Sequence, residues 1–221
     1  QERNSYIPIE VHWSEVPGRD SKWKEETIKN TSESQFNTEF ECEFLGSIDT
    51  LITPAKLKTL AYREPLQSNA GLDVHIKPEE DHTYMLTADV SRGTSNDYSA
   101  FIVFDITEIP YKVVAKFRSN TVAPLHFPNI INTIGKRYNY AYILVEINDI
   151  GSQVADVLHH DLEYENLYSC SWYGRHGQQI SSGAKKDSYF GVRTTKSMKK
   201  IGCSNLKSLI EENKLLFNDY D

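Results

Sequence analysis

The stretch that decides the fold is Thr83-Tyr-Met-Leu-Thr-Ala-Asp-Val-Ser91, an apolar run with an acid, Asp89, near its end. A second stretch, Tyr142-Ile-Leu-Val-Glu-Ile-Asn148, carries Glu146 in its interior. Both are typical of β-strands, because they are short and rich in apolar, β-branched and aromatic residues. Burying an ionised carboxylate is costly unless a cation or hydrogen-bond donors compensate it. Acids on two such strands therefore indicate a metal site.

The elements around these stretches follow a defined order. Hydrophobic periodicity and turn residues predict strands at residues 83–91, 98–106, 111–118, 141–147, 167–172 and 215–217, and helices at residues 124–138, 150–160 and 204–213. The first three strands form an antiparallel meander, and the helix after them allows the next strand to lie parallel to the first. This order is that of a ribonuclease-H-like α/β fold, a mixed sheet flanked by helices. In such a sheet Asp89 and Glu146 face each other on neighbouring strands.

Residues 1–70 read as a partly helical linker region rather than as sheet. Asp20 is placed to cap the helix that follows it, because its side chain can accept a backbone N–H of the first turn. The same argument predicts that Asp149 caps the helix after it and that Ser204 caps the last long helix. The expected division is residues 1–70 for the linker region and residues 71–221 for the α/β domain.

A third acid, Asp97, follows Asp89 closely in the chain. It is a candidate for the same site, or alternatively the acid of an Asx turn in a hairpin. Carboxylates that converge from separate strands hold Mg²⁺ or Mn²⁺ through oxygen, and a pair of such ions activates water and stabilises the leaving oxygen of a phosphodiester. The alternative for Asp89 is a strand-end acid that caps the turn at Gly93, and for Glu146 a strand residue that faces solvent.

The charge of the chain is unevenly distributed. Its formal value of −7 over 221 residues argues by itself against a nucleic-acid partner. Between residues 185 and 200, however, six basic residues stand against one acid, so this stretch carries +5 and the rest of the chain −12. The six are Lys185, Lys186, Arg193, Lys196, Lys199 and Lys200. Because Tyr189 and Phe190 are interleaved with them, the stretch is a candidate for phosphate contact, and a solvated loop is the alternative.

Other kinds of site find no support in the sequence. The three cysteines form no Cys-x-x-Cys pair, which argues against a zinc or dithiol site. There is no Gly-x-x-x-x-Gly-Lys phosphate loop and no Gly-x-Ser-x-Gly elbow. There is also no run of about 18 apolar residues and no leader resembling a signal peptide, so an intracellular protein without a membrane partner is expected.

Several longer segments are more specific than any single motif. They are Tyr6-Ile-Pro-Ile-Glu10, Trp13 to Asp20, Gln35 to Ser47, Asp89-Val-Ser-Arg-Gly93 with Asp97-Tyr-Ser-Ala100, Ser119-Asn-Thr121, and Ile201 to Ile210. With these segments the chain resembles the large terminase subunit of tailed bacteriophages. In that family an N-terminal ATPase drives DNA translocation, and a C-terminal ribonuclease-H-like domain cuts concatemeric DNA into genome units.

The resemblance implies roles for single residues. Asp89 matches the catalytic aspartate of the first strand and Glu146 the glutamate of the fourth, with Mg²⁺ or Mn²⁺ as cofactor, while Asp97 matches a further acid near the site. Residues 1–70 would be the end of the ATPase region, so ATP would act only through an ATPase domain that this chain lacks. The family's third metal-binding aspartate lies in a His-Asp-Asp segment, and the chain stops at Asp221 before such a segment. A nuclease domain truncated at its C-terminus is therefore expected.

The resemblance thus implies an endonuclease that hydrolyses phosphodiesters of double-stranded DNA by a two-metal mechanism. It would act in the host cell cytoplasm during phage assembly, with DNA, the portal and the small terminase subunit as partners. A non-cleaving DNA-docking or assembly module of the packaging motor is the alternative, because the third acid is missing. A ribonuclease-H-like resolvase or transposase is a further alternative, which the segments Pro17-Gly-Arg-Asp20 and Gly202-Cys-Ser204 disfavour.

Overall fold

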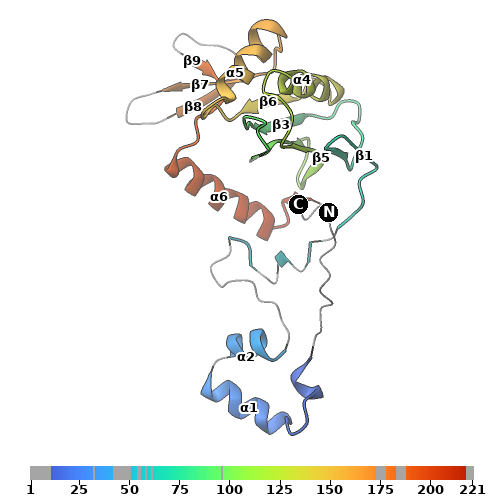
Figure 1. Cartoon of the computed structure of the whole chain (residues 1–221), viewed down its shortest axis with the longest axis vertical. Coiled ribbons are helices and arrows are strands. Elements are labelled where there is room, and N and C mark those ends of the chain that lie inside the picture. The colour runs from blue at the N-terminus through green and yellow to red at the C-terminus, as the bar shows by residue number, and fades with distance from the viewer. Residues whose placement is uncertain are drawn as a thin grey trace. The chain divides into compact units, whose positions relative to one another are not determined.

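The chain folds into two compact units, Gln1–Thr59 and Leu60–Asp221. The computed structural model describes residues 11–31, 33–41, 51–53, 56–57, 59–60, 62–95, 97–172, 178–182 and 188–217. Figure 1 traces the chain and labels its helices and strands. Within these ranges no helix combines the length and the apolar character that crossing a membrane requires.

The first unit contains short helices. A 3₁₀ turn, η1 (Trp13–Glu15), precedes α1 (Ser21–Asn30) and α2 (Glu33–Glu39). The predicted helix cap is confirmed, since the side chain of Asp20 accepts the backbone N–H of Trp23 at 2.8 Å. This hydrogen bond satisfies one of the amides that the first turn of a helix leaves without an intrahelical partner.

Four aromatic rings form the core of the first unit. Neighbouring ring centroids lie 5.3–6.1 Å apart. The rings belong to Trp13, Trp23, Phe36 and Phe40. Because each aromatic side chain buries a large apolar area, four of them give a short segment a small core.

The second unit is built on a seven-stranded mixed sheet. Its order among the described strands is β1-β2-β5-β4-β3-β6, with β10 beside β5. The strands are β1 (Gln67–Asn69), β2 (Leu72–Val74), β3 (Tyr84–Asp89), β4 (Ser99–Asp105), β5 (Tyr111–Ser119), β6 (Tyr142–Val145) and β10 (Leu215–Leu216). The predicted meander of β3, β4 and β5 is confirmed, and so is the parallel pairing of β3 with β6.

Helices and a smaller sheet complete this unit, and Figure 1 shows α4 and α6 on opposite sides of the large sheet. The helices are α4 (Phe127–Arg137), α5 (Gly151–Asp156) with its π-helical continuation η2 (Val157–Asp161), and α6 (Lys196–Glu211). The smaller sheet has the order β8-β7-β9 and contains β7 (Tyr168–Trp172), β8 (Gln178–Ser182) and β9 (Ser188–Phe190). α4 provides the crossover that a parallel β3–β6 pair needs.

Two features differ from the expectations drawn from the sequence. The hairpin β1–β2 extends the sheet, although β1 lies in the predicted linker region and no strand was predicted at β2. Gly71 makes it possible, because its φ is +86° and a Cβ there would collide with the carbonyl of Arg118 on β5. The last long helix begins at Lys196 rather than at Ser204, because the side chain of Thr195 accepts the N–H of Met198 at 3.3 Å and caps it.

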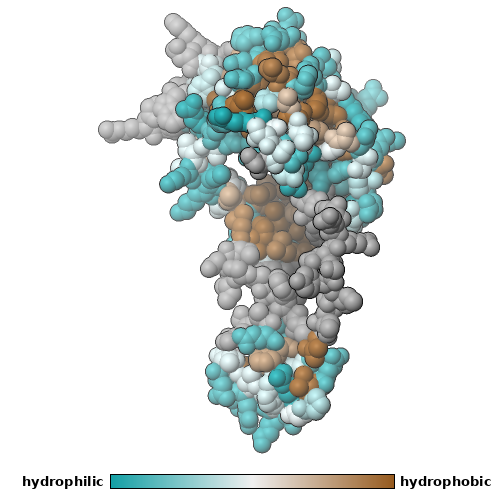
Figure 2. Space-filling view, in the orientation of Figure 1, coloured by the Kyte–Doolittle hydropathy of each residue, from teal (hydrophilic) through white to brown (hydrophobic). Residues whose placement is uncertain are grey.

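The two faces of the large sheet are covered unequally. On β3, Leu86 and Ala88 are buried, whereas Thr87 between them is partly exposed. Ile102 lies beside Thr87 on β4 and is 39% exposed. Figure 2, coloured by hydropathy, shows that some apolar side chains reach the surface of the second unit. One face therefore carries the core, and the other, more open face is the one from which Asp89 emerges.

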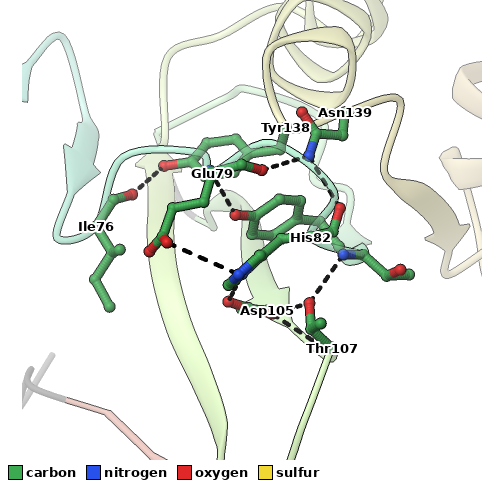
Figure 3. A network of polar contacts seen from close by, with 9 residues as sticks. Ile76, Glu79, His82, Asp105, Thr107, Tyr138 and Asn139 are labelled. Carbon is green, nitrogen blue, oxygen red and sulfur yellow. Dashed lines mark hydrogen bonds and ion pairs between the residues drawn. The ribbon is translucent and has the colours of Figure 1, made fainter.

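A second strand-end acid, Asp105, lies at the far end of β4 within a polar network (Figure 3). Its Oδ1 accepts the backbone N–H and the hydroxyl of Thr107 at 3.0 and 2.6 Å, and its Oδ2 lies 2.8 Å from Nδ1 of His82. Burial acts to raise the pKa of Asp105, but these hydrogen bonds lower it overall. The hydrogen bond to Asp105 in turn raises the pKa of His82. Asp105 is thus a fully compensated, structural acid.

Two glycines in helices give a matched test of packing. A Cβ added at Gly135 in α4 would collide with the buried ring of Tyr164, whereas one added at Gly202 in α6 meets nothing within 4 Å. We expect Gly135→Ala to lower the free energy of unfolding by about 1–3 kcal/mol, because overpacking displaces neighbouring groups. Gly202→Ala should raise it by up to about 1 kcal/mol. Denaturant unfolding measures both, and effects of the same sign would contradict this account.

The His82–Asp105 pair predicts a stability that depends on pH. The raised pKa of His82 contributes stability that is complete below its ordinary value of 6.5 and is lost as pH rises through the folded value. The lowered pKa of Asp105 contributes above 3.8, so the pair stabilises most between these values. His82→Gln should therefore lower the melting temperature at about pH 5 and much less at about pH 9.

Thermal unfolding of His82→Gln at the two pH values provides the measurement. The same substitution at His126, whose side chain is exposed and makes no cap hydrogen bond to α4, is the control. It should change little at either pH. An equal loss for His82→Gln at both values would show that the ring acts through packing and not through its charge.

Candidate functional site

The two acids that stand out in the sequence meet at the ends of adjoining parallel strands. β3 and β6 are in register up to Ala88 and Val145. The backbone N–H of Glu146 then donates to the carbonyl of Ala88 at 2.8 Å. Asp89 and Glu146 are the next residues of the two strands, and since side chains alternate between faces, both leave the open face. The pairing of the strands is what brings these carboxylates together.

The backbone of Glu146 is held on both sides. Val192 forms a parallel bridge with Glu146 on the side away from β3, where its N–H donates to Val145 at 2.8 Å and its carbonyl accepts from Ile147 at 2.9 Å. Gly151 packs against the carbonyl of Glu146 so closely that a Cβ would collide with it. The position of this acid is therefore fixed by the sheet on one side and by a glycine at the start of α5 on the other.

The charge of the acid pair is not compensated. Burial, a hydrogen bond with Glu146 and the negative charge of Glu146 together raise the pKa of Asp89 to about 6, against the opposite effect of the backbone N–H of Val90. Asp105 differs from Asp89, because its hydrogen bonds lower its pKa. A cation bound between Asp89 and Glu146 would relieve the repulsion that the structure builds into this pair.

Asp97 lies near the pair but makes local hydrogen bonds. Its side chain is exposed, its Oδ1 accepts the N–H of Tyr98 at 2.8 Å, and its carbonyl accepts the hydroxyl of Ser91 at 3.1 Å. The hydrogen bond to Tyr98 reaches one residue along the chain, whereas an Asx turn reaches two, so these contacts decide neither interpretation of Asp97. Its negative charge also contributes to the raised pKa of Asp89, so the two carboxylates interact. A role for Asp97 in metal binding stays a prediction.

A salt bridge that the sequence did not reveal joins the loops that follow the two acids. Nε and one terminal nitrogen of Arg92 donate to the two carboxylate oxygens of Asp149 at 2.8 and 2.6 Å. The prediction that Asp149 caps α5 is wrong, since Ile150 holds the cap position and makes no side-chain cap hydrogen bond. Each partner stands three residues after its acid, Asp89 or Glu146. Positions equally far along two strands that pair in parallel come close in space. The equal spacing was therefore the feature of the sequence from which this salt bridge could have been predicted.

The acids line a cleft of about 330 Å³ on the open face of the sheet. Its polar lining comprises Thr87, Asp89, Glu146, Thr194 and Lys199. Asn148 fixes one wall, because its Nδ2 donates to Oε1 of Glu146 at 3.3 Å and to the carbonyl of Thr194 at 3.0 Å. In the part of the chain that the structure describes, no cluster of three or more His, Cys, Asp or Glu side chains could hold a metal. The site therefore offers two carboxylates, which suit a hard cation that completes its shell with water.

Four of the six basic residues predicted to contact phosphate are described. Arg193 precedes α6, and Lys196, Lys199 and Lys200 lie in its first turns, all with exposed side chains. Lys199 is the one of these four that lines the acidic cleft. The remaining two, Lys185 and Lys186, lie outside the described residues.

A known family of domains matches residues 86–221, more than half of the chain, and is described as the terminase RNaseH-like domain. The chain is also similar in structure to the large terminase nuclease of thermophilic phage G20c with bound magnesium, at 18% identity and a TM-score of 0.58, over 79% of this chain and 77% of that one. The same nuclease with bound zinc matches at 20% identity and a TM-score of 0.55, over 75% and 80% of the two chains. The large terminase nuclease domain of Thermus phage P74-26 matches at 20% identity and a TM-score of 0.50, over 75% and 71%. At these identities the solved structures establish the fold.

The raised pKa of Asp89 predicts that Asp89→Asn stabilises the metal-free chain. An acid with a raised pKa lowers stability as pH rises from its ordinary value of 3.8 through about 6. Asparagine does not titrate, so the variant should melt about 1–3 °C above the wild type at about pH 7 in a chelator, and at the same temperature below about pH 4. Thermal unfolding across this range is the measurement. A variant less stable at neutral pH would refute the proposed repulsion.

Proposed function

Because the chain belongs to the family of terminase RNaseH-like domains, we propose that its second unit is a metal-dependent endonuclease that cuts concatemeric double-stranded DNA during phage genome packaging. The observation that carries this proposal is the placement of Asp89 and Glu146 on one open cleft at the ends of adjoining parallel strands. The similar nucleases with bound magnesium and zinc support it.

The chain's own contribution is to place two carboxylates where they hold a divalent cation. Asp89 is the proposed bridging ligand and Glu146 the second ligand of Mg²⁺ or Mn²⁺, both of which prefer oxygen ligands. A cation bound there supplies a polarised phosphate and a water of lowered pKa, and two cations share these tasks in the two-metal form of the reaction. Hydrolysis joins the water oxygen to phosphorus and breaks one phosphorus–oxygen ester bond. One proton of the water ends on the released hydroxyl, and the other stays on the new phosphate monoester or passes to solvent.

Two sets of contacts keep the acids in position for this chemistry. Asn148 donates to Glu146 and ties it to Thr194, which limits the rotation of the Glu146 side chain. The salt bridge between Arg92 and Asp149 links the loops that leave the two strands. Side chains that orient metal ligands in this way commonly alter metal affinity when they are removed.

DNA is the proposed substrate and binds through its phosphates. The four described basic residues, Arg193, Lys196, Lys199 and Lys200, are exposed, and Lys199 lines the cleft that contains the acids. Cations that neutralise phosphates give an affinity that does not depend on base sequence and that falls with salt. Such contacts fit an enzyme that cuts with little sequence preference, and Lys185 and Lys186 are proposed to extend them.

The wider setting is proposed from the family. The chain would act in the host cell cytoplasm during phage assembly, with the portal and the small terminase subunit as protein partners. Residues 1–70 would belong to the end of the ATPase region, whose nucleotide site would lie elsewhere in the motor. None of these partners bears on the chemistry of the cleft.

A non-cleaving DNA-docking module is the second candidate function. The observation that favours it is the number of acids, because the described residues bring two carboxylates to the cleft and a pair of metal ions commonly uses more. The two functions differ in one outcome. A docking module binds DNA but leaves it intact in Mg²⁺ and in Mn²⁺.

Nicking of a supercoiled plasmid tests the proposal. The wild type should nick in Mg²⁺ or Mn²⁺ and not in a chelator, and Asp89→Asn and Glu146→Gln should each reduce the rate at least about 100-fold, because each removes a ligand charge at constant volume. Asp161→Asn, which changes an exposed acid of η2, is the control and should nick normally. Wild-type rates in either site variant would refute the assigned roles. DNA binding without nicking by the wild type would favour the docking module.

A further inference from the structure

The cleft that holds the two acids is also lined by a basic residue, Lys199. Among the described residues Lys199 forms no salt bridge with Asp89 or Glu146, although all three side chains line the same 330 Å³ space. A lysine that shares a cleft with two carboxylates without pairing with them leaves room between the opposite charges. A cation and an anion that bind together would fit there.

The start of α6 is tied to the strand of Glu146, and this fixes where Lys199 lies. Val192 hydrogen-bonds to the backbone on either side of Glu146, and Asn148 links the Glu146 side chain to Thr194. The next residue, Thr195, caps α6, and its carbonyl accepts the N–H of Lys199 at 2.9 Å. A short series of hydrogen bonds therefore ties the backbone of Lys199 to the strand that carries Glu146.

A second anchor holds the start of this helix from β8. Oε1 of Gln178 accepts the N–H of Arg193 at 2.9 Å, and its Nε2 donates to the carbonyl of Arg193 at 2.6 Å. The same Nε2 lies 3.0 Å from Sδ of Met198, the residue before Lys199. Because the helix is held on both sides, the backbone of Lys199 is fixed with respect to the acids while its side chain stays free to bind a ligand.

Charge balance indicates which ligand this would be. Two carboxylates neutralise one divalent cation, whereas phosphodiester hydrolysis concentrates further negative charge on the phosphate oxygens, which a second positive group must stabilise. Lys199 is the cationic side chain that the described cleft contains. A lysine ammonium is a compact point charge suited to a phosphate oxygen.

We propose that Lys199 is a catalytic residue, whose ammonium binds a non-bridging oxygen of the scissile phosphate opposite the cation held by Asp89 and Glu146. This inference rests on the proposed nuclease function and deepens it. The proposed role of Lys199 differs from that of Lys196, Lys200 and Arg193. These three are proposed to contact the DNA backbone away from the scissile phosphate. No proton or bond is transferred by Lys199, because its role is electrostatic.

The adjacent Lys200 provides a matched control. It has the same charge, is likewise exposed and follows Lys199 in the same helix, but it does not line the cleft. Successive residues point about 100° apart around an α-helix, so the two ammonium groups leave α6 in different directions. Replacing either by methionine removes the charge and keeps most of the apolar stem.

Metal binding gives the first readout and requires no cleavage. Calorimetry with Mn²⁺ on the whole chain should show tighter binding by Lys199→Met than by the wild type, by about threefold or more, because a like charge has been removed from the wall of the site. Lys200→Met should bind Mn²⁺ as the wild type does. Asp89→Asn should lose the binding, which identifies the site.

Plasmid nicking gives the second readout. At saturating DNA, Lys199→Met should nick at least about 100-fold more slowly, with DNA affinity lowered less than about threefold. Lys199→Arg should recover part of the rate, since it restores the charge. Lys200→Met should mainly weaken DNA binding, with a salt dependence reduced by about one phosphate contact. Lys207→Met, which changes an exposed lysine farther along α6, should keep the saturated rate.

The outcomes separate this inference from the function on which it rests. Equal effects of Lys199→Met and Lys200→Met on DNA affinity, with unchanged saturated rates, would make Lys199 an ordinary backbone contact and overturn its catalytic role. Mn²⁺ binding that depends on Asp89 but is unaffected by Lys199→Met would likewise overturn it, and would leave the proposed function standing. A wild type without Asp89-dependent Mn²⁺ binding would overturn both.

Discussion

The parallel pairing of β3 with β6 is the constraint on which the second unit depends. It needs a crossover, which α4 supplies, and it places two acids of distant sequence side by side at the ends of the two strands. It also leaves the far edge of Glu146 free to pair with Val192, through which the start of α6 is attached. A sheet in which β3 and β6 were not neighbours would not bring the two acids together.

Asp89 and Asp105 show how one residue type serves two purposes in one sheet. Both end a strand, yet Asp105 receives hydrogen bonds from Thr107 and His82 and its pKa is lowered. Asp89 instead faces another carboxylate, and its pKa is raised. The fold thus satisfies one acid by itself and leaves the other facing a like charge. Such an uncompensated charge distinguishes a binding group from a structural one.

Much of this architecture could be predicted from the sequence, because the strands of the meander, α4 and the cap at Asp20 depend on local patterns. Other features depend on partners far along the chain. Glycine is needed at position 71 because the carbonyl of Arg118 lies too close for a Cβ. The salt bridge of Arg92 with Asp149 depends on the register between β3 and β6. The local pattern of apolar and polar residues does not reveal which residues far apart in the chain come into contact. For the same reason the sequence indicated Asp89 and Glu146 as site residues, but not Asn148 and Arg92, whose contacts hold the site in place.

The residues that stabilise the sheet and the residues that line the cleft lie mainly on opposite faces of the sheet. Residues on the closed face, such as Leu86 and Val145, are fully buried, so a change there disturbs the packing of the whole unit. Thr87 on β3 and Ile102 on β4 line the cleft and are at least partly exposed, so replacing them opens no internal cavity. Single substitutions at these positions can therefore change the shape and polarity of the cleft without disturbing the core. Such changes leave the buried side chains beneath the cleft untouched.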